Sequence, residues 1–199
     1  KTAAAKVIAR DIIFIIDTSG SMQGSSMNQA KMSLQLALLQ LNDKDSFNII
    51  AFDDDTALLF PITQMASLQN INKAQQFIDH LSADGGTQMY RPLSNALMMK
   101  KNELQSVKAI RQIIFITDGA VANEFELMQL LNSAQGDFRL YTVGIGAAPN
   151  GYFMKKAAQF GRGNYVFIQN LKDVQQKMTR FMTKISQPAI SNITLKLDN

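Results

Sequence analysis

Continuous apolar runs mark two segments of the chain as buried β-strands. Residues 11–16 (DIIFII) and 112–117 (QIIFIT) are almost entirely apolar, and each run ends at an aspartate, Asp17 or Asp118. Further strands are expected at residues 47–52, 140–143 and 164–167. Strands that are apolar on both faces are typical of a parallel sheet covered by helices on either side.

Apolar residues that recur every three or four positions predict six helices around these strands. The apolar stripes lie at residues 27–41, 71–81, 89–97, 125–134, 153–160 and 171–185. The first helix is expected to begin at a capping box, because Ser26 and Gln29 have the spacing that such a box requires. Helices alternate with strands along the chain, which predicts an α/β fold with a mostly parallel central sheet.

An acidic turn is expected to add one antiparallel strand at the edge of this sheet. Asp53, Asp54 and Asp55 separate the strand at 47–52 from a second strand-like run at 56–60. Three consecutive aspartates could bind a cation, but Asp is also favoured in exposed turns. A solvated hairpin turn is the preferred interpretation.

Composition limits the possible functions. The chain has 199 residues, of which 46% are hydrophobic, so it can bury the core of one domain. Its formal net charge of +4 does not predict a nucleic-acid surface, because no basic stripe is interleaved with aromatic residues. Cysteine is absent, which excludes disulfides and thiolate metal sites, and no apolar run approaches the ~20 residues needed for membrane insertion.

Five oxygen-bearing side chains are expected to converge at one edge of the sheet, where the strands end and where ligands of open α/β sheets bind. Asp17, Ser19 and Ser21 occupy alternate positions directly after the first strand, so they can face the same point. Asp118 follows another strand, and Thr87 follows two glycines before the third helix. Such hard oxygen donors suit Mg²⁺, Mn²⁺ or Ca²⁺ rather than zinc.

At these positions the chain resembles the von Willebrand factor type A family. The family's metal-ion-dependent adhesion site is Asp-x-Ser-x-Ser, a distant Thr and a distant Asp, and its five positions are filled by Asp17, Ser19, Ser21, Thr87 and Asp118. The strings FIIDTSGSM, DKDSFNIIAF, INKAQQFIDHLSADGGTQM and IIFITDG are most similar to the A domains of inter-alpha-trypsin inhibitor heavy chains and their bacterial relatives.

The resemblance implies a fold, a cofactor and a kind of partner. The fold would be a Rossmann-like three-layer αβα sandwich. The cofactor would be Mg²⁺, with Mn²⁺ or Ca²⁺ as alternatives, held by the five residues named above. The partner would be a protein that supplies an Asp or Glu carboxylate to the ion, and the domain would act in adhesion or protein recognition rather than as an enzyme.

Two other functions stay open at this point. The domain could regulate an intracellular assembly such as a chelatase-type ATPase complex. Alternatively, it could be a Mg²⁺-dependent hydrolase with Asp17 as nucleophile. The hydrolase is less favoured, because Ser19 stands where haloacid-dehalogenase-like phosphatases have a second aspartate.

The end of the chain has a different pattern. Residues 1–187 are assigned to the A domain, whereas Ile193, Leu195 and Leu197 alternate with polar residues at strand period. Residues 188–199 are therefore expected to begin a following β-rich module of a larger multidomain chain. An extracytoplasmic location, in the cell envelope or secreted, is the expectation that goes with this organisation.

Overall fold

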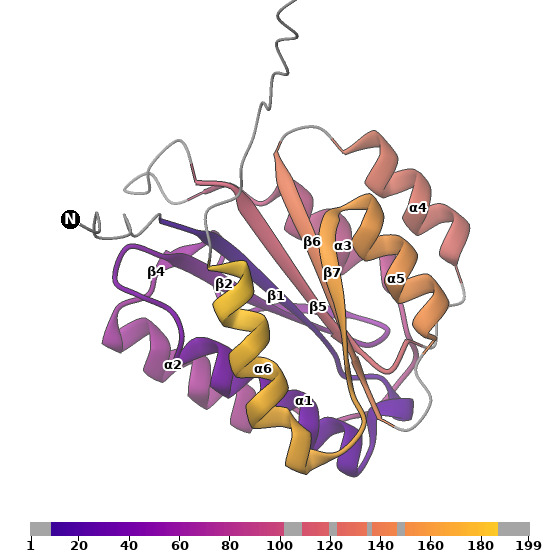
Figure 1. Cartoon of the computed structure of the whole chain (residues 1–199), viewed down its shortest axis with the longest axis horizontal. Helices are drawn as coiled ribbons and strands as arrows, with labels where there is room; N and C mark the ends of the chain where they lie inside the picture. The colour runs from indigo at the N-terminus through magenta and orange to yellow at the C-terminus, as the bar shows by residue number, and fades with distance from the viewer. Residues whose placement is uncertain (1–8, 102–108, 120–122, 135–136, 147–149, 187–199) are drawn as a thin grey trace, which may run out of the picture.

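The computed structural model describes residues 9–101, 109–119, 123–134, 137–146 and 150–186, which form a three-layer α/β sandwich (Figure 1). The strands are β1 (Asp11–Asp17), β2 (Ser46–Phe52), β3 (Thr56–Leu58), β4 (Gln64–Met65), β5 (Arg111–Thr117), β6 (Phe138–Ile145) and β7 (Arg162–Ile168). The helices are the short 3₁₀ helix η1 (Gly20–Met22), then α1 (Ser25–Leu38), α2 (Leu68–Asp79), α3 (Tyr90–Met98), α4 (Glu124–Ser133), α5 (Gly151–Phe160) and α6 (Leu171–Ile185). This architecture confirms the α/β fold class.

The sheet is parallel except at one edge. Its strand order is β3-β2-β1-β5-β6-β7, and β1 pairs in parallel with both β2 and β5. The predicted antiparallel edge strand is β3, which pairs with the end of β2. The two-residue strand β4, which was not predicted, pairs antiparallel with the start of β2.

Alternate residues of β1 contribute to two separate hydrophobic cores. Ile12, Phe14 and Ile16 pack with α1, α2 and α6 on one face of the sheet. Ile13 and Ile15 pack with α3, α4 and α5 on the other face. All five side chains are completely buried, and burying a side chain of this size stabilises the fold by roughly 1.5–3 kcal/mol. The core therefore fixes β1 from both sides, and with it the position where β1 ends.

Helix α1 begins in a different way from the predicted capping box. Its N-cap is Gly24, with φ at +74°, and no side chain caps the helix. Gln29 is buried and donates to the carbonyl of Gln169, at 3.5 Å, instead of reaching back to the helix start. The capping-box prediction was wrong because the helix begins after Gly24, whose positive φ other residues rarely adopt.

Two buried ion pairs lie at the amino ends of the central strands. Arg10 Nη2 lies 2.5 Å from Asp45 Oδ2, and Arg111 Nη2 lies 2.8 Å from Asp11 Oδ2. Both carboxylate side chains are completely buried, and both arginines are almost so. Removing one partner of such a pair leaves an uncompensated buried charge, which is strongly destabilising.

The remaining expectations about organisation concern other parts of the chain. Residues 188–199, for which a following β-rich module is predicted, lie outside the described residues. Within the described ranges, none of the helices combines the length and the apolar character that crossing a bilayer requires.

Candidate metal centre

The paired strands β1 and β5 bring the two predicted aspartates to the same edge of the sheet. Ile16 of β1 is in register with Ile116 of β5. Asp17 is the last residue of β1, and Asp118 directly follows β5. Asp17 is completely buried, whereas Asp118 is partly exposed. One carboxylate therefore lies inside the sheet edge and the other at its surface.

Both oxygens of the Asp17 carboxylate accept hydrogen bonds from neighbouring residues. Oδ1 accepts from the Ser19 backbone N–H at 2.9 Å, and Oδ2 accepts from the Thr117 hydroxyl at 2.5 Å. Burial raises the pKa of Asp17, hydrogen bonds from Ser19 and Thr117 oppose that rise, and the nearby charge of Asp118 adds to it. Both burial and the neighbouring carboxylate disfavour the charged form of Asp17, and a cation beside the two carboxylates would relieve this.

The two serines lie side by side in the loop after β1. The hydroxyl oxygens of Ser19 and Ser21 are 3.1 Å apart. Ser19 is almost completely buried next to η1, and Ser21, which belongs to η1, is exposed. The two serines of the DTSGS motif therefore have adjacent hydroxyl groups.

The loop that carries Thr87 is hydrogen-bonded to the serine loop. The N–H of Gly20 donates to the carbonyl of Gly85 at 3.1 Å, and the N–H of Asp84 donates to the carbonyl of Thr18 at 2.8 Å. Thr87, two residues after Gly85, is partly exposed. Two segments about 65 residues apart in the sequence are thus joined by their backbones.

The acidic turn at residues 53–55 is hydrogen-bonded to the loop that carries Thr87. Asp53 Oδ1 accepts from the N–H of Asp55, and the backbone carbonyl of Asp53 accepts from Gln88, both at 2.8 Å. Asp54 accepts from the N–H of Gly86, where a β-carbon would overlap the Asp54 carboxylate. The turn is thus a hairpin turn, as preferred from the sequence, and it also positions the segment around Thr87.

Glycine is required where the chain leaves Asp118. Gly119 has φ at +82°, and a β-carbon on it would lie 2.7 Å from the backbone nitrogen of Asn150. The Asn150 side chain caps α5 by accepting from the N–H of Phe153 and donates to Glu124 at the start of α4. Gly119 therefore packs against the start of α5, which Asn150 links to the start of α4.

Two threonines that position these loops were not singled out from the sequence. The hydroxyl of Thr117 donates to Asp17 and accepts from the N–H of Gly119 at 2.9 Å, so it connects both aspartate loops. The hydroxyl of Thr18 donates to the carbonyl of Phe52 at 2.8 Å. The signal for Thr117 was its place as the last strand residue before Asp118, in a strand parallel to the one that ends at Asp17.

The five residues offer two carboxylates and three hydroxyls. Among the described residues, His, Cys, Asp and Glu side chains do not gather in groups of three or more that could hold a metal. A set of this composition presents only hard oxygen donors, and its modest charge is suited to Mg²⁺ or Mn²⁺, which keep several of their waters.

The chain belongs to the von Willebrand factor type A domain family. The family model matches residues 10–167. A von Willebrand factor A domain-containing protein of Dictyostelium discoideum is 27% identical over 184 residues, which cover 92% of this chain and 19% of that protein. The chain thus spans about a fifth of the length of such relatives. They are von Willebrand factor A domain-containing proteins, a class that generally serves protein interaction rather than catalysis.

Solved structures agree with the family assignment. A von Willebrand factor type A structure from Catenulispora acidiphila has a TM-score of 0.77 and 25% identity, over 89% of this chain and 42% of that one. The manganese-loaded TRAP protein of Plasmodium vivax has the same fold, with a TM-score of 0.64 and 21% identity, over 87% of this chain and 73% of that one.

Proposed function

We propose that this domain binds a protein partner through a divalent cation, Mg²⁺ or Mn²⁺, held by Asp17, Ser19, Ser21, Thr87 and Asp118. The observation that carries the proposal is the pair of carboxylates at the ends of β1 and β5, one buried, beside two serine hydroxyls 3.1 Å apart. The manganese in the similar TRAP structure supports a cation in a domain of this fold.

The partner group would be a carboxylate. Three of the five proposed ligands are neutral hydroxyls, so a bound cation would keep Lewis acidity toward an incoming negatively charged oxygen. An Asp or Glu side chain of another protein supplies such an oxygen, and the desolvation of that side chain would be offset by its contact with the ion.

The surroundings of Asp17 argue against the hydrolase. A nucleophilic carboxylate must reach the substrate, but Asp17 is completely buried and both of its oxygens accept hydrogen bonds from the protein. Its position is suited to holding a cation site in place. Adhesion at an extracytoplasmic surface and regulation inside an assembly both remain possible uses of the same site.

Calorimetric titration with Mn²⁺ tests the site, with Asp17→Ala and Asp118→Ala as the variants and the exposed Asp43→Asn as the control. We expect the first two substitutions to weaken Mn²⁺ binding by at least about 10- to 100-fold, the loss typical of changes even outside the coordination sphere. Equal affinity in all four proteins would exclude the site. Partner capture from the source organism, with Mg²⁺ and then with chelator, tests the function.

A further inference from the structure

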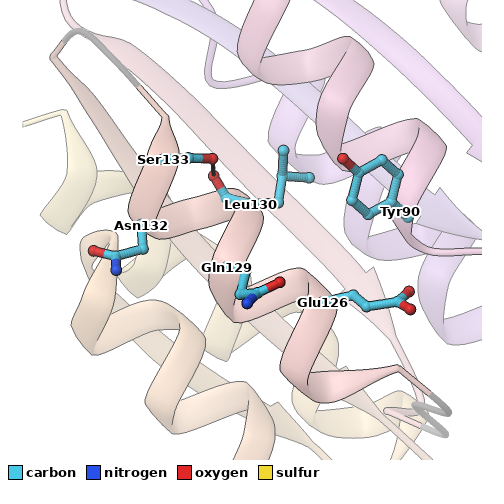
Figure 2. A pocket seen from close by; sticks show the side chains of 6 residues that line it. All are labelled: Tyr90, Glu126, Gln129, Leu130, Asn132 and Ser133. Atoms are coloured by element: carbon cyan, nitrogen blue, oxygen red, sulfur yellow. Dashed lines mark hydrogen bonds between the residues drawn. The ribbon is translucent and has the colours of Figure 1, made fainter.

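A shallow groove separates helices α3 and α4 on the face of the sheet that they cover. Its volume is about 640 Å³. Figure 2 shows the six residues that line it, which are Tyr90, Glu126, Gln129, Leu130, Asn132 and Ser133. Tyr90 comes from α3 and the others from α4, so the groove has two walls of different chemistry.

One end of the groove lies beside the proposed cation site. Tyr90 follows Thr87 by three residues, so their Cα atoms can be at most about 11 Å apart. Glu126 lies in the first turn of α4, and α4 begins at the same edge of the sheet as Asp118. In Figure 2 the side chains of Tyr90 and Glu126 both lie on the side of the groove away from Asn132 and Ser133, with the Tyr90 ring facing Leu130.

The chemistry of this end is suited to a positive charge. The Tyr90 side chain is 45% exposed, and Glu126 is exposed. Within the described parts of the chain, no Lys or Arg pairs with Glu126 or lies over the Tyr90 ring. The ring of Tyr152, at the start of α5, differs because a lysine of the same helix lies over it: Lys156 Nζ is 4.8 Å from the ring centroid.

We propose that the Tyr90 and Glu126 end of the groove binds a Lys or Arg side chain of the same polypeptide partner that supplies the carboxylate to the cation. This inference rests on the proposed function. A cation over the tyrosine ring and beside the glutamate gains from both groups, and a guanidinium suits them best because it is planar. The partner is thus an extended segment in which an acidic residue and a basic residue have a fixed spacing.

A random 12-residue peptide library displayed on phage provides the probe. The library is selected on the whole domain in Mg²⁺ and eluted with EDTA, and the enriched peptides are synthesised and measured by fluorescence polarisation. We expect these peptides to share an Asp or Glu and, at one preferred spacing, a Lys or Arg. Twelve residues can extend over about 40 Å, which is enough to reach both sites.

Four variants of the domain locate the basic side chain. Glu126→Gln and Tyr90→Ala should each weaken the peptide about two- to fivefold, as expected for a partly exposed ion pair or cation–π contact. The controls are Asp43→Asn, at an exposed carboxylate before β2, and Phe160→Ala, at an aromatic 43% exposed at the end of α5. Neither control should change the affinity. When the basic residue of the peptide is replaced by Gln, Glu126→Gln should have no further effect.

The outcomes separate the two proposals. Two results would overturn the groove inference and leave the proposed function intact. The first is a set of Mg²⁺-dependent peptides without a shared basic residue. The second is a loss of affinity in Glu126→Gln and Tyr90→Ala that is no greater than the loss in the controls. Peptides that bind equally well in EDTA and to Asp118→Ala overturn the proposed function, and the inference that rests on it.

Discussion

Two aspartates at opposite ends of strand β1 are both completely buried but have opposite surroundings. Asp11 accepts hydrogen bonds from the Arg111 guanidinium and the Ser46 hydroxyl, each at 2.8 Å. Asp17, about 20 Å away along the strand, accepts from uncharged groups and has the carboxylate of Asp118 as its charged neighbour. The protein itself neutralises the first carboxylate. The second is the kind of buried charge that a bound cation would neutralise.

The largest expected effect comes from breaking the pair at Asp11. Arg111→Met should lower the free energy of unfolding by about 3–5 kcal/mol, because Asp11 keeps its burial but loses its cation. Urea denaturation measures this loss. The control is Arg162→Met, since the ion pair of Arg162 with Asp137 is 3.6 Å long and exposed, and its removal should cost less than about 1 kcal/mol. Equal losses in both variants would show that burial does not distinguish the two pairs.

The next effect comes from supplying a cation at Asp17. Mg²⁺ at 100 times its dissociation constant should raise the free energy of unfolding by about 2.7 kcal/mol, and Asp17→Asn should lose this gain. In chelator, Asp17→Asn should change stability much less, because it removes a buried charge whose ionised form burial disfavours, as the raised pKa of Asp17 indicates, but its amide keeps only one of the two oxygens that accept hydrogen bonds.

Thermal unfolding with and without Mg²⁺ measures the stabilisation by the cation. The control is Asp43→Asn, which Mg²⁺ should stabilise as much as it stabilises the parent protein. Loss of cooperative unfolding in chelator would identify a structural ion, contrary to the proposed role. If Asp17→Asn kept the full Mg²⁺ effect, the cation would bind elsewhere.

The contrast between the two ends also explains what the sequence could predict. The strands that end at Asp17 and Asp118 were found because their apolar runs are continuous, and α6 has the predicted bounds because its apolar stripe is regular. The pairs at Arg10 and Arg111 were missed, because a charged residue at the start of a strand looks exposed until its partner is known. Their partners Asp45 and Asp11 lie 35 and 100 residues away in the sequence.

The placement of the two aspartates was predictable for a different reason. The edge where parallel strands end is fixed by topology, so the sequence alone placed Asp17 and Asp118 at the same edge of the sheet. The supporting contacts were not predictable. The hydrogen bond from Thr117 to Asp17 depends on the register of β1 with β5, and the contact of Gly119 with Asn150 depends on where α5 begins.

A smaller effect is expected where Thr117 supports the site. Thr117→Val removes the donor to Asp17 and the acceptor of the Gly119 N–H, which should cost about 1–2 kcal/mol of stability and weaken Mn²⁺ binding about tenfold. Thr142→Val is the matched control. It removes the buried hydrogen bond of Thr142 to the carbonyl of Met154, so it should lower stability similarly while leaving Mn²⁺ affinity unchanged. Equal Mn²⁺ affinity in both variants would reduce Thr117 to a packing residue.

The smallest effect is expected at Gln112, at the amino end of β5. Its side-chain N–H donates to the carbonyl of Ile185, the last residue of α6, at 2.9 Å, while its Oε1 is buried without a hydrogen-bond partner among the described residues. Gln112→Leu removes both the bond and the unpaired oxygen, so the net loss of stability should be only about 1 kcal/mol.

This variant decides whether the two ends of the sheet are independent. Gln112 and Thr117 are on the same strand, about 17 Å apart, and β5 is held between β1 and β6. Substitutions at such a distance without a shared partner normally add, so Gln112→Leu should leave Mn²⁺ affinity within about twofold, and the double variant with Thr117→Val should show the sum of both stability losses. Mn²⁺ titration and urea denaturation of the parent, the two single variants and the double variant complete this double-mutant cycle. A tenfold change in Mn²⁺ affinity from Gln112→Leu would instead mean that the end of α6 is energetically coupled to the cation loops through β5. The two ends of the sheet would then not be independent.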